Sequence, residues 1–232
     1  MTTFVLVHGS WHDGSAWRDV IRRLEVRGHK AFGPTVSGHG KGVCKRVSHA
    51  RSTQSIVNFI VGHDLTDVVL GRTHLWGNDH QQGRGGDPGS SSVTGVLERF
   101  VLNDGESIND TVPPHFRGLF RQLAAASPDN TVMLPFTIWR EAFLNDADLT
   151  VARSSYELLS AEPYQQILEP LDLKKFYALD TPRSYLVRSE DIALPPGEWG
   201  WHPRMSSRLG LYRLVQMPGG HERIFTNKRL GR

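Results

Sequence analysis

Short apolar runs that alternate with stretches of helical periodicity are the feature that most constrains the fold of this chain. An apolar run at residues 4–7 ends in a glycine-rich turn, and residues 15–27 then place apolar side chains at helical spacing. A weaker run at residues 31–36, a helical face at 52–61 and a buried run at 67–70 continue the alternation. This order predicts an α/β protein with a mostly parallel sheet, right-handed crossovers and helices on both faces.

The rest of the chain predicts one domain with an insertion. A chain of 232 residues, 38% of them hydrophobic, can bury one sizeable core, so residues 1–232 are expected to form a single domain. Residues 112–178 show proline-punctuated helical patterns, which predict an inserted helical cap at about 105–178. Runs at 183–187 and 211–217 are the last two strand candidates.

The pattern breaks between residues 71 and 92. The only large apolar side chains in that stretch are Leu75 and Trp76. Structureless stretches longer than about 15 residues are uncommon inside compact domains. The stretch therefore either has a special role or counts against the regular pattern, and periodicity returns at Phe100.

Charge and composition exclude several partners. The net charge is +3, and the basic residues are dispersed without interleaved aromatic residues, so no nucleic-acid partner is expected. The first apolar run is too short for a signal peptide or a membrane span, so a cytoplasmic protein without a membrane partner is expected. The single cysteine, Cys44, cannot form an intrachain disulfide, which suits a reducing compartment.

Metal and phosphate sites are not expected either. His8, His12 and Asp13 fit a loop after the first strand, and His74 and His80 lie in the irregular stretch. The glycine-rich residues 83–86 lack the lysine and hydroxyl residues of a phosphate-binding loop. No metal is therefore predicted.

Chemistry-bearing residues follow three of the predicted strands. Gly9 and Ser10 follow the first strand, Asp191 follows a later one, and His221 follows the last one. Ligand sites in open parallel sheets lie at the carboxyl ends of the strands. A carboxylate that orients an imidazole, and an imidazole that accepts a proton from a hydroxyl, form the base half of a nucleophilic triad. Backbone N–H groups of the first turn could stabilise an oxyanion.

With these motifs the chain resembles the α/β-hydrolase superfamily, in the branch of plant methylesterases, hydroxynitrile lyases and small bacterial esterases. The matching segments are residues 7–12 with Gly14 and Trp17, 67–70, 189–191 with Pro195, and 220–221. The resemblance implies an α/β-hydrolase fold with a helical cap and cofactor-independent hydrolysis of a carboxylic ester.

The resemblance also implies roles for individual residues. Asp191 would be the triad acid, His221 the general base, and the turn of Gly9 and Ser10 the oxyanion site. The implied partner is a small-molecule ester or aromatic ligand, and a homodimer is left open. The aromatic residues of the cap could line this pocket, although at helical spacing a role in the cap core is favoured. They are Phe116, Phe120, Phe136, Trp139, Phe143 and Tyr156.

The chain departs from the family at the nucleophile. The family places a Gly-x-Ser-x-Gly elbow after the strand that matches residues 67–70, whereas residues 71–77 here read GRTHLWG. Thr73 is the nearest hydroxyl, but a β-branched residue is poorly suited to the strained elbow backbone, so the nucleophile stays unassigned. Codons for parts of residues 71–99, read one base later, can encode a helix-like and a strand-like segment. A compensated frameshift over this region is therefore our hypothesis.

Three interpretations remain open at this stage. The chain is an esterase impaired by the missing serine, a non-catalytic pseudo-hydrolase that binds a small ligand, or a serine-independent lyase or oxygenase that uses His221 and Asp191. Ester turnover separates the first of these from the other two.

Overall fold

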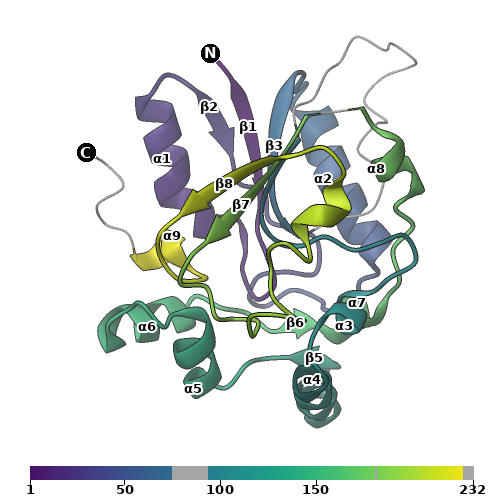
Figure 1. Cartoon of the computed structure of the whole chain (residues 1–232), viewed down its shortest axis with the longest axis vertical. Helices are drawn as coiled ribbons and strands as arrows, with labels where there is room; N and C mark the ends of the chain where they lie inside the picture. The colour runs from purple at the N-terminus through teal and green to yellow at the C-terminus, as the bar shows by residue number, and fades with distance from the viewer. Residues whose placement is uncertain (75–93, 181, 227–232) are drawn as a thin grey trace.

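The computed structural model describes residues 1–74, 94–180 and 182–226, with residues 72–74 and 94–99 described by their backbone. Its main sheet contains β1 (Thr3–Val7), β2 (Lys30–Phe32), β3 (Val68–His74), β4 (Thr94–Phe100), β7 (Arg183–Arg188) and β8 (Arg213–Met217). The strand order is β2-β1-β3-β4-β7-β8, and every neighbouring pair is parallel (Figure 1). The prediction of an α/β fold with a parallel sheet is confirmed.

The first half of the sheet follows the sequence pattern closely. Val5 and Val7 pack with Ile56 of α2 (His49–Gly62) in one buried cluster, and Leu6, which points to the opposite face of the strand, is also buried. A short 3-10 helix, η1 (Gly14–Trp17), leads into α1 (Arg18–Val26). Helices α1 and α2 lie on opposite sides of these strands (Figure 1).

The middle of the sheet differs from expectation at β3 and β4. β3 continues to His74, beyond the predicted end at residue 70, and β4 forms over residues 94–100, where the sequence pattern showed no strand before Phe100. Strand β4 pairs with β3 on one side and β7 on the other, so its backbone groups find partners at both edges. This pairing overrides a weak local pattern. The hypothesis of a frameshift falls in part on residues 75–93, which lie outside the described residues.

Between β4 and β7 the chain forms an insert, residues 101–180. It holds α3 (Ile108–Thr111), α4 (Pro114–Ala126), α5 (Phe136–Ile138), the π-helical turn η3 (Trp139–Phe143), α6 (Leu149–Tyr156), α7 (Tyr164–Leu168) and α8 (Lys174–Ala178). The helical prediction missed a small antiparallel pair, β5 (Thr131–Val132) and β6 (Glu162–Pro163). Two-residue strands leave no periodic signal in a sequence. Helices α4, α5 and α6 lie beyond the end of the sheet at which β1 terminates (Figure 1).

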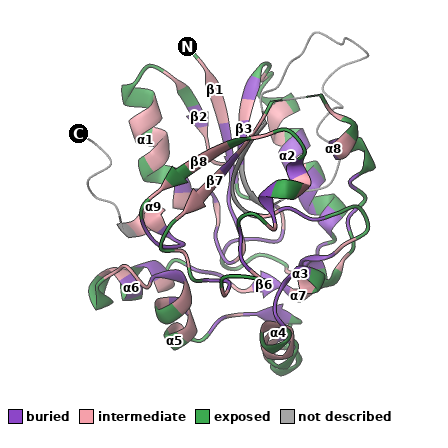
Figure 2. Ribbon diagram, in the orientation of Figure 1, coloured by how far each residue is buried: buried purple, intermediate pink, exposed green. Residues whose placement is uncertain are grey.

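One large hydrophobic cluster joins the insert to the second half of the sheet. Trp139, Leu134 and Leu144 of the insert belong to the same cluster as Tyr185 of β7 and Met205, and all five are almost fully buried. Figure 2 shows buried positions on the loops that connect the sheet to the insert. The chain then passes through η4 (Ser206–Leu209) and β8 to the short α9 (Arg223–Thr226). None of the helices in the described ranges has the length and apolar character needed to cross a membrane.

Candidate active site

The site forms where the carboxyl ends of the strands meet the insert. The chain passes from β1 to β2 on one side and then to β3 on the other side of β1, so the strand order reverses between β1 and β3. Ligands in open α/β sheets bind outside the strand ends at such a switch point. The loop after β1 supplies residues 8–13, and the loops after β7 and β8 supply Asp191 and His221.

His221 and Asp191, predicted from the sequence, lie side by side in the structure. Nδ1 of His221 is 2.7 Å from Oδ2 of Asp191, and the side chains are 2% and 0% exposed. The other carboxylate oxygen, Oδ1, accepts the backbone N–H of Ala193 at 3.0 Å. The imidazole stacks on Trp201 with ring centroids 5.5 Å apart and meets the ring of Phe143 edge-on at 5.0 Å. The carboxylate and these two rings together fix the plane of the imidazole.

The backbone around His221 is held from both the sheet and the insert. Arg188 of β7 donates through Nη1 to the carbonyl oxygens of Gly220 and His221, at 3.1 and 2.6 Å. The N–H of Gly220 donates to Oδ2 of Asp146 in the insert at 3.0 Å. A Cβ at Gly220 would lie 2.6 Å from Oδ1 of Asn145 and 2.8 Å from Oδ1 of Asp146, so a larger residue here would have to displace these two side chains of the insert. The glycine of the Gly-His motif therefore serves close packing against the insert.

The loop after β1 takes its shape from the insert. Trp11 has a φ of 65°, which is uncommon for a residue with a side chain. Its N–H donates to Oε2 of Glu162 at 2.9 Å, its carbonyl accepts the N–H of Ser160 at 2.8 Å, and its Nε1 donates to the carbonyl of Val132 at 2.9 Å. These bonds hold the turn of Gly9 and Ser10 at the rim of the pocket. Sequence analysis did not single out Glu162, which lies 151 residues from Trp11.

His8 and His39, near this loop, make contacts that support the fold. Nε2 of His8 accepts the N–H of Val36 at 3.0 Å, so Nδ1 carries the proton that His8 donates to the carbonyl of Gly9 at 2.9 Å. Burial, together with the nearby His39, lowers the pKa of His8 to about 3. His39 places Nε2 3.1 Å from Oε2 of Glu162. Among residues 1–74, 94–180 and 182–226, no group of three or more potential ligands is arranged to hold a metal ion.

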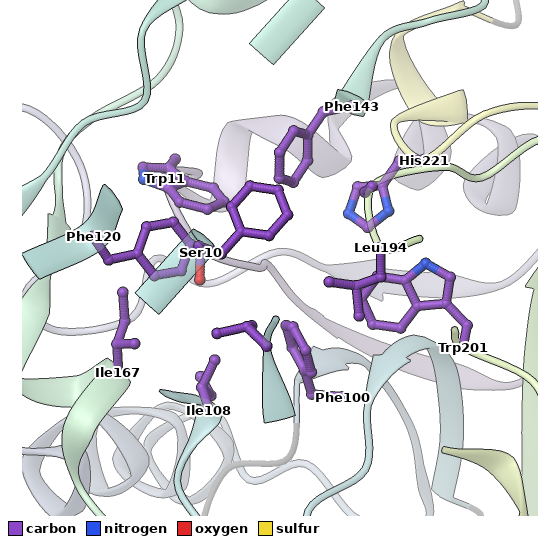
Figure 3. Close-up of a pocket in the computed structure, with 13 residues that line it drawn as sticks. Ser10, Trp11, Phe100, Ile108, Phe120, Phe143, Ile167, Leu194, Trp201 and His221 are labelled. Carbon is purple, nitrogen blue, oxygen red and sulfur yellow. The ribbon is translucent and has the colours of Figure 1, made fainter. Parts of the chain in front are cut away.

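An apolar pocket opens beside His221 and Ser10 (Figure 3). It encloses about 40 Å³ and is lined by Ser10, Trp11, Phe100, Ile108, Val112, Phe116, Phe120, Phe143, Ile167, Ala193, Leu194, Trp201 and His221. Of the six aromatic residues that sequence analysis named as possible pocket residues, Phe116, Phe120 and Phe143 line this pocket. All six also belong to or pack against the large hydrophobic cluster, so the two interpretations of these residues are compatible. Ser10 lies beside Trp11 and Phe120, and His221 lies beside Phe143 and Trp201 (Figure 3).

The predicted nucleophile position does not form a turn at residues 71–74. Thr73 lies within β3, where the backbone continues as a strand. A nucleophile elbow requires a sharp turn between strand and helix. Residues 75–93, which include Ser90, Ser91 and Ser92, lie outside the described residues. The structure thus brings together His221, Asp191 and the turn of Gly9 and Ser10, and it leaves Thr73 in the sheet.

Comparisons with known proteins agree with this architecture. No family model matches the chain. A carbendazim-hydrolyzing esterase from Nocardioides sp. (strain SG-4G) is 29% identical over 133 residues, which is 55% of this chain, and the match spans about half (50%) of the esterase's length. An extracellular α/β-hydrolase from a Paenibacillus species, described as sharing structural and functional homology with tobacco salicylic acid binding protein 2, is 37% identical with a TM-score of 0.88. That match covers 96% of this chain and 92% of the hydrolase.

More distant structures share the fold. A pyrethroid hydrolase from Sphingobium faniae JZ-2 has a TM-score of 0.73 at 19% identity, over 99% of this chain and 94% of its own. A methylesterase from Arabidopsis has a TM-score of 0.69 at 16% identity, over 97% and 93%. The chain therefore belongs to the α/β-hydrolase superfamily.

Proposed function

We propose that this chain acts on small carboxylic esters through a base assembled from His221 and Asp191. The contact of 2.7 Å between them, with His221 at the wall of an apolar pocket, is the observation that carries the proposal. His221 takes a proton from the attacking hydroxyl, and Asp191 orients the ring and stabilises its positive charge. The backbone N–H of Ser10 stabilises the oxyanion from the turn after β1.

The pocket favours an uncharged substrate with an aromatic or aliphatic group. Aromatic and aliphatic side chains dominate its wall, with Ser10 and His221 as the polar members. Contact with such a wall stabilises the apolar surface of a bound substrate, whereas a charged group of the substrate would lose its water without gaining a partner of opposite charge. The residues proposed for catalysis imply no metal or cofactor, and a cytoplasmic location and a homodimer stay predictions.

Hydrolysis is expected to be slow. Thr73 lies in a strand, so the described part of the chain does not supply a hydroxyl at the family's elbow position. In serine hydrolases, removal of a triad member still leaves a rate about 10³- to 10⁴-fold above that in water, from binding and oxyanion stabilisation. The position of Thr73 in β3 also favours a second candidate function, because it leaves the described residues without an elbow hydroxyl. In this function the chain binds a small ligand without turning it over. Serine-independent base chemistry by His221 and Asp191 is a third.

A fluorophosphonate probe combined with an ester assay tests the proposal. We expect hydrolysis of a p-nitrophenyl ester above the solvent rate. His221→Ala should lower this rate to the part that binding and oxyanion stabilisation supply. His63→Ala should retain the full rate, because His63 is an exposed histidine at the end of α2. Mass spectrometry of the labelled protein then locates the nucleophile, and a tryptic mass map of residues 71–99 checks the printed sequence. Hydrolysis at the wild-type rate in His221→Ala would refute the assigned base. Saturable binding of an aromatic ester without labelling or turnover would favour the binding protein.

A further inference from the structure

A third imidazole–carboxylate pair lies directly beside His221. Nε2 of His12 is 3.4 Å from Oε1 of Glu222, and the two side chains are 5% and 1% exposed. His12 comes from the loop after β1, two residues beyond Ser10, and Glu222 follows His221 in the loop after β8. This pair therefore connects the loop proposed to hold the oxyanion with the loop that carries the proposed base.

The same carboxylate also faces His221. Oε1 of Glu222 is 3.8 Å from Nε2 of His221, while Oδ2 of Asp191 is 2.7 Å from Nδ1. The imidazole of His221 therefore has a carboxylate near each of its nitrogens. A separation of 3.8 Å is too long for a hydrogen bond, so the interaction between Glu222 and His221 is Coulombic.

Because Asp191, His221, His12 and Glu222 are all buried, the charge on each of them affects the protonation of the others. Two carboxylates and two imidazoles lie together with side chains at most 5% exposed. A buried charge is costly unless an opposite charge accompanies it. With Asp191 and Glu222 ionised, the set is neutral when both rings are imidazolium ions, each protonated on both nitrogens. The Glu222 carboxylate therefore favours the protonated ring of His221.

Other charged groups act on the same loop through its backbone. Arg188 donates to the carbonyl oxygens of Gly220 and His221, and Oε1 of Glu190 accepts the N–H of Gly219. Asp146 accepts the N–H of Gly220 and lies 3.4 Å from Nη1 of Arg223. Aromatic rings also pack against the two imidazoles, namely Phe143 and Trp201 against His221, and Trp139 and Phe225 against His12. Substitution of Glu222 leaves all of these groups in place.

We propose that Glu222, held by His12, is a positioning residue that stabilises the positively charged form of the His221 ring. The inference rests on the proposed function in that His221 is taken as the residue that accepts the proton. In hydrolysis the carboxylate would ease formation of the imidazolium. It would also make the neutral, proton-accepting ring available only at higher pH.

An NMR titration of the histidine rings tests this inference without ester turnover. The His221 signals are assigned in the full chain by their loss in His221→Ala. We expect Glu222→Gln, which keeps size and polarity, to move the His221 titration midpoint to lower pH by about one pH unit. The matched control is Glu25→Gln, which removes an exposed carboxylate of α1 and should leave the midpoint in place. An unchanged midpoint in folded Glu222→Gln would overturn the inference.

A second variant separates electrostatics from loosening of the loop. His12→Gln removes the imidazole that shares Glu222, so the carboxylate then has His221 as its nearest imidazole and the midpoint should move to higher pH. A purely structural role of the pair predicts shifts in the same direction for both variants, and that result would refute the proposal. If Glu222→Gln does not fold, His12→Gln decides alone, and a shift to lower pH or no shift is the negative result.

The two proposals fail separately. Ester hydrolysis at an unchanged rate in His221→Ala removes the proposed function and leaves the titration result standing. Hydrolysis that depends on His221, together with midpoints that do not respond to Glu222, removes only this inference.

Discussion

Two of the buried imidazole–carboxylate pairs in this molecule are similar in burial but differ in their surroundings. His39 and Glu162 are 3.1 Å apart with side chains 1% and 5% exposed, and His221 and Asp191 are 2.7 Å apart at 2% and 0%. Glu162 also accepts the N–H of Trp11 and fastens the insert to the loop after β1. The ring of His221, in contrast, lines a pocket. The pair alone does not define a catalytic base, because the ring must also reach a cavity.

The largest expected effect tests the pair at the pocket. Asp191→Asn should lower the rate of ester hydrolysis to the level that binding and oxyanion stabilisation alone supply, because the amide no longer stabilises the imidazolium of His221. The measurement is the rate constant at pH 7, with the free energy of unfolding from urea denaturation as a check on folding. Wild-type hydrolysis in folded Asp191→Asn would remove the distinction between the two pairs.

The matching change in the other pair should act on stability. Glu162→Ala leaves the N–H of Trp11 and the ring of His39 without their carboxylate, so the free energy of unfolding should fall by about 3–5 kcal/mol. Urea denaturation measures this loss. The control is Glu157→Ala, an exposed glutamate of the same insert, which should change stability by less than about 0.5 kcal/mol. Equal losses of unfolding free energy in Glu162→Ala and Glu157→Ala would show that Glu162 does not stabilise the contact between the insert and the loop after β1.

Acid should weaken the fold through histidines that are buried without charge. Burial lowers the pKa of His8 to about 3 and that of His49 to about 4, whereas both take up protons near 6.5 in the unfolded chain. The unfolded state therefore binds more protons below pH 6.5, and stability falls as the pH falls. Between pH 6.5 and 5 each group should contribute a loss of about 2 kcal/mol.

Urea denaturation at pH 7 and pH 5 measures this loss. In His8→Gln the amide can still accept the N–H of Val36 but does not titrate, so the variant should lose less stability on acidification than the wild type. An equal loss in both proteins would show that His8 does not contribute to acid sensitivity.

The smallest effect concerns the indole of Trp11. Trp11→Phe removes the hydrogen bond from Nε1 to the carbonyl of Val132, and the loss of unfolding free energy should be about 1 kcal/mol. Thermal or urea unfolding detects this difference. A loss of unfolding free energy as large as that expected for Glu162→Ala would contradict this prediction. It would show that the side chain of Trp11 contributes as much to holding the loop as its backbone N–H does.

Periodicity and turn residues in the sequence predicted the helices and strands that short-range interactions specify. The run at residues 4–7, the helix of residues 49–62 and the strands before Asp191 and His221 follow from periodicity and turn residues. Asp191 and His221 were found because each follows a strand, and the structure brings them together. Their catalytic roles stay predictions.

Other features depend on partners that are distant in the sequence. Glu162 finds His39 at a separation of 123 residues, and β4 depends on strands on both sides. The signal for Glu162 and Glu222 would have been a buried carboxylate, which a single sequence does not reveal. The nucleophile could not be placed either, because Thr73 lies in a strand and residues 75–93 are outside the described part of the chain.

The positive φ of Trp11 has a consequence for the order in which the molecule assembles. The groups that hold Trp11 in place, Val132, Ser160 and Glu162, emerge from the ribosome more than a hundred residues after Trp11 itself. Before these groups dock, their three hydrogen bonds to Trp11 are missing. Trp11 then lacks these bonds to hold its positive φ, which a residue with a side chain seldom adopts. The first loop of the chain therefore reaches its final shape only after the insert has been synthesised.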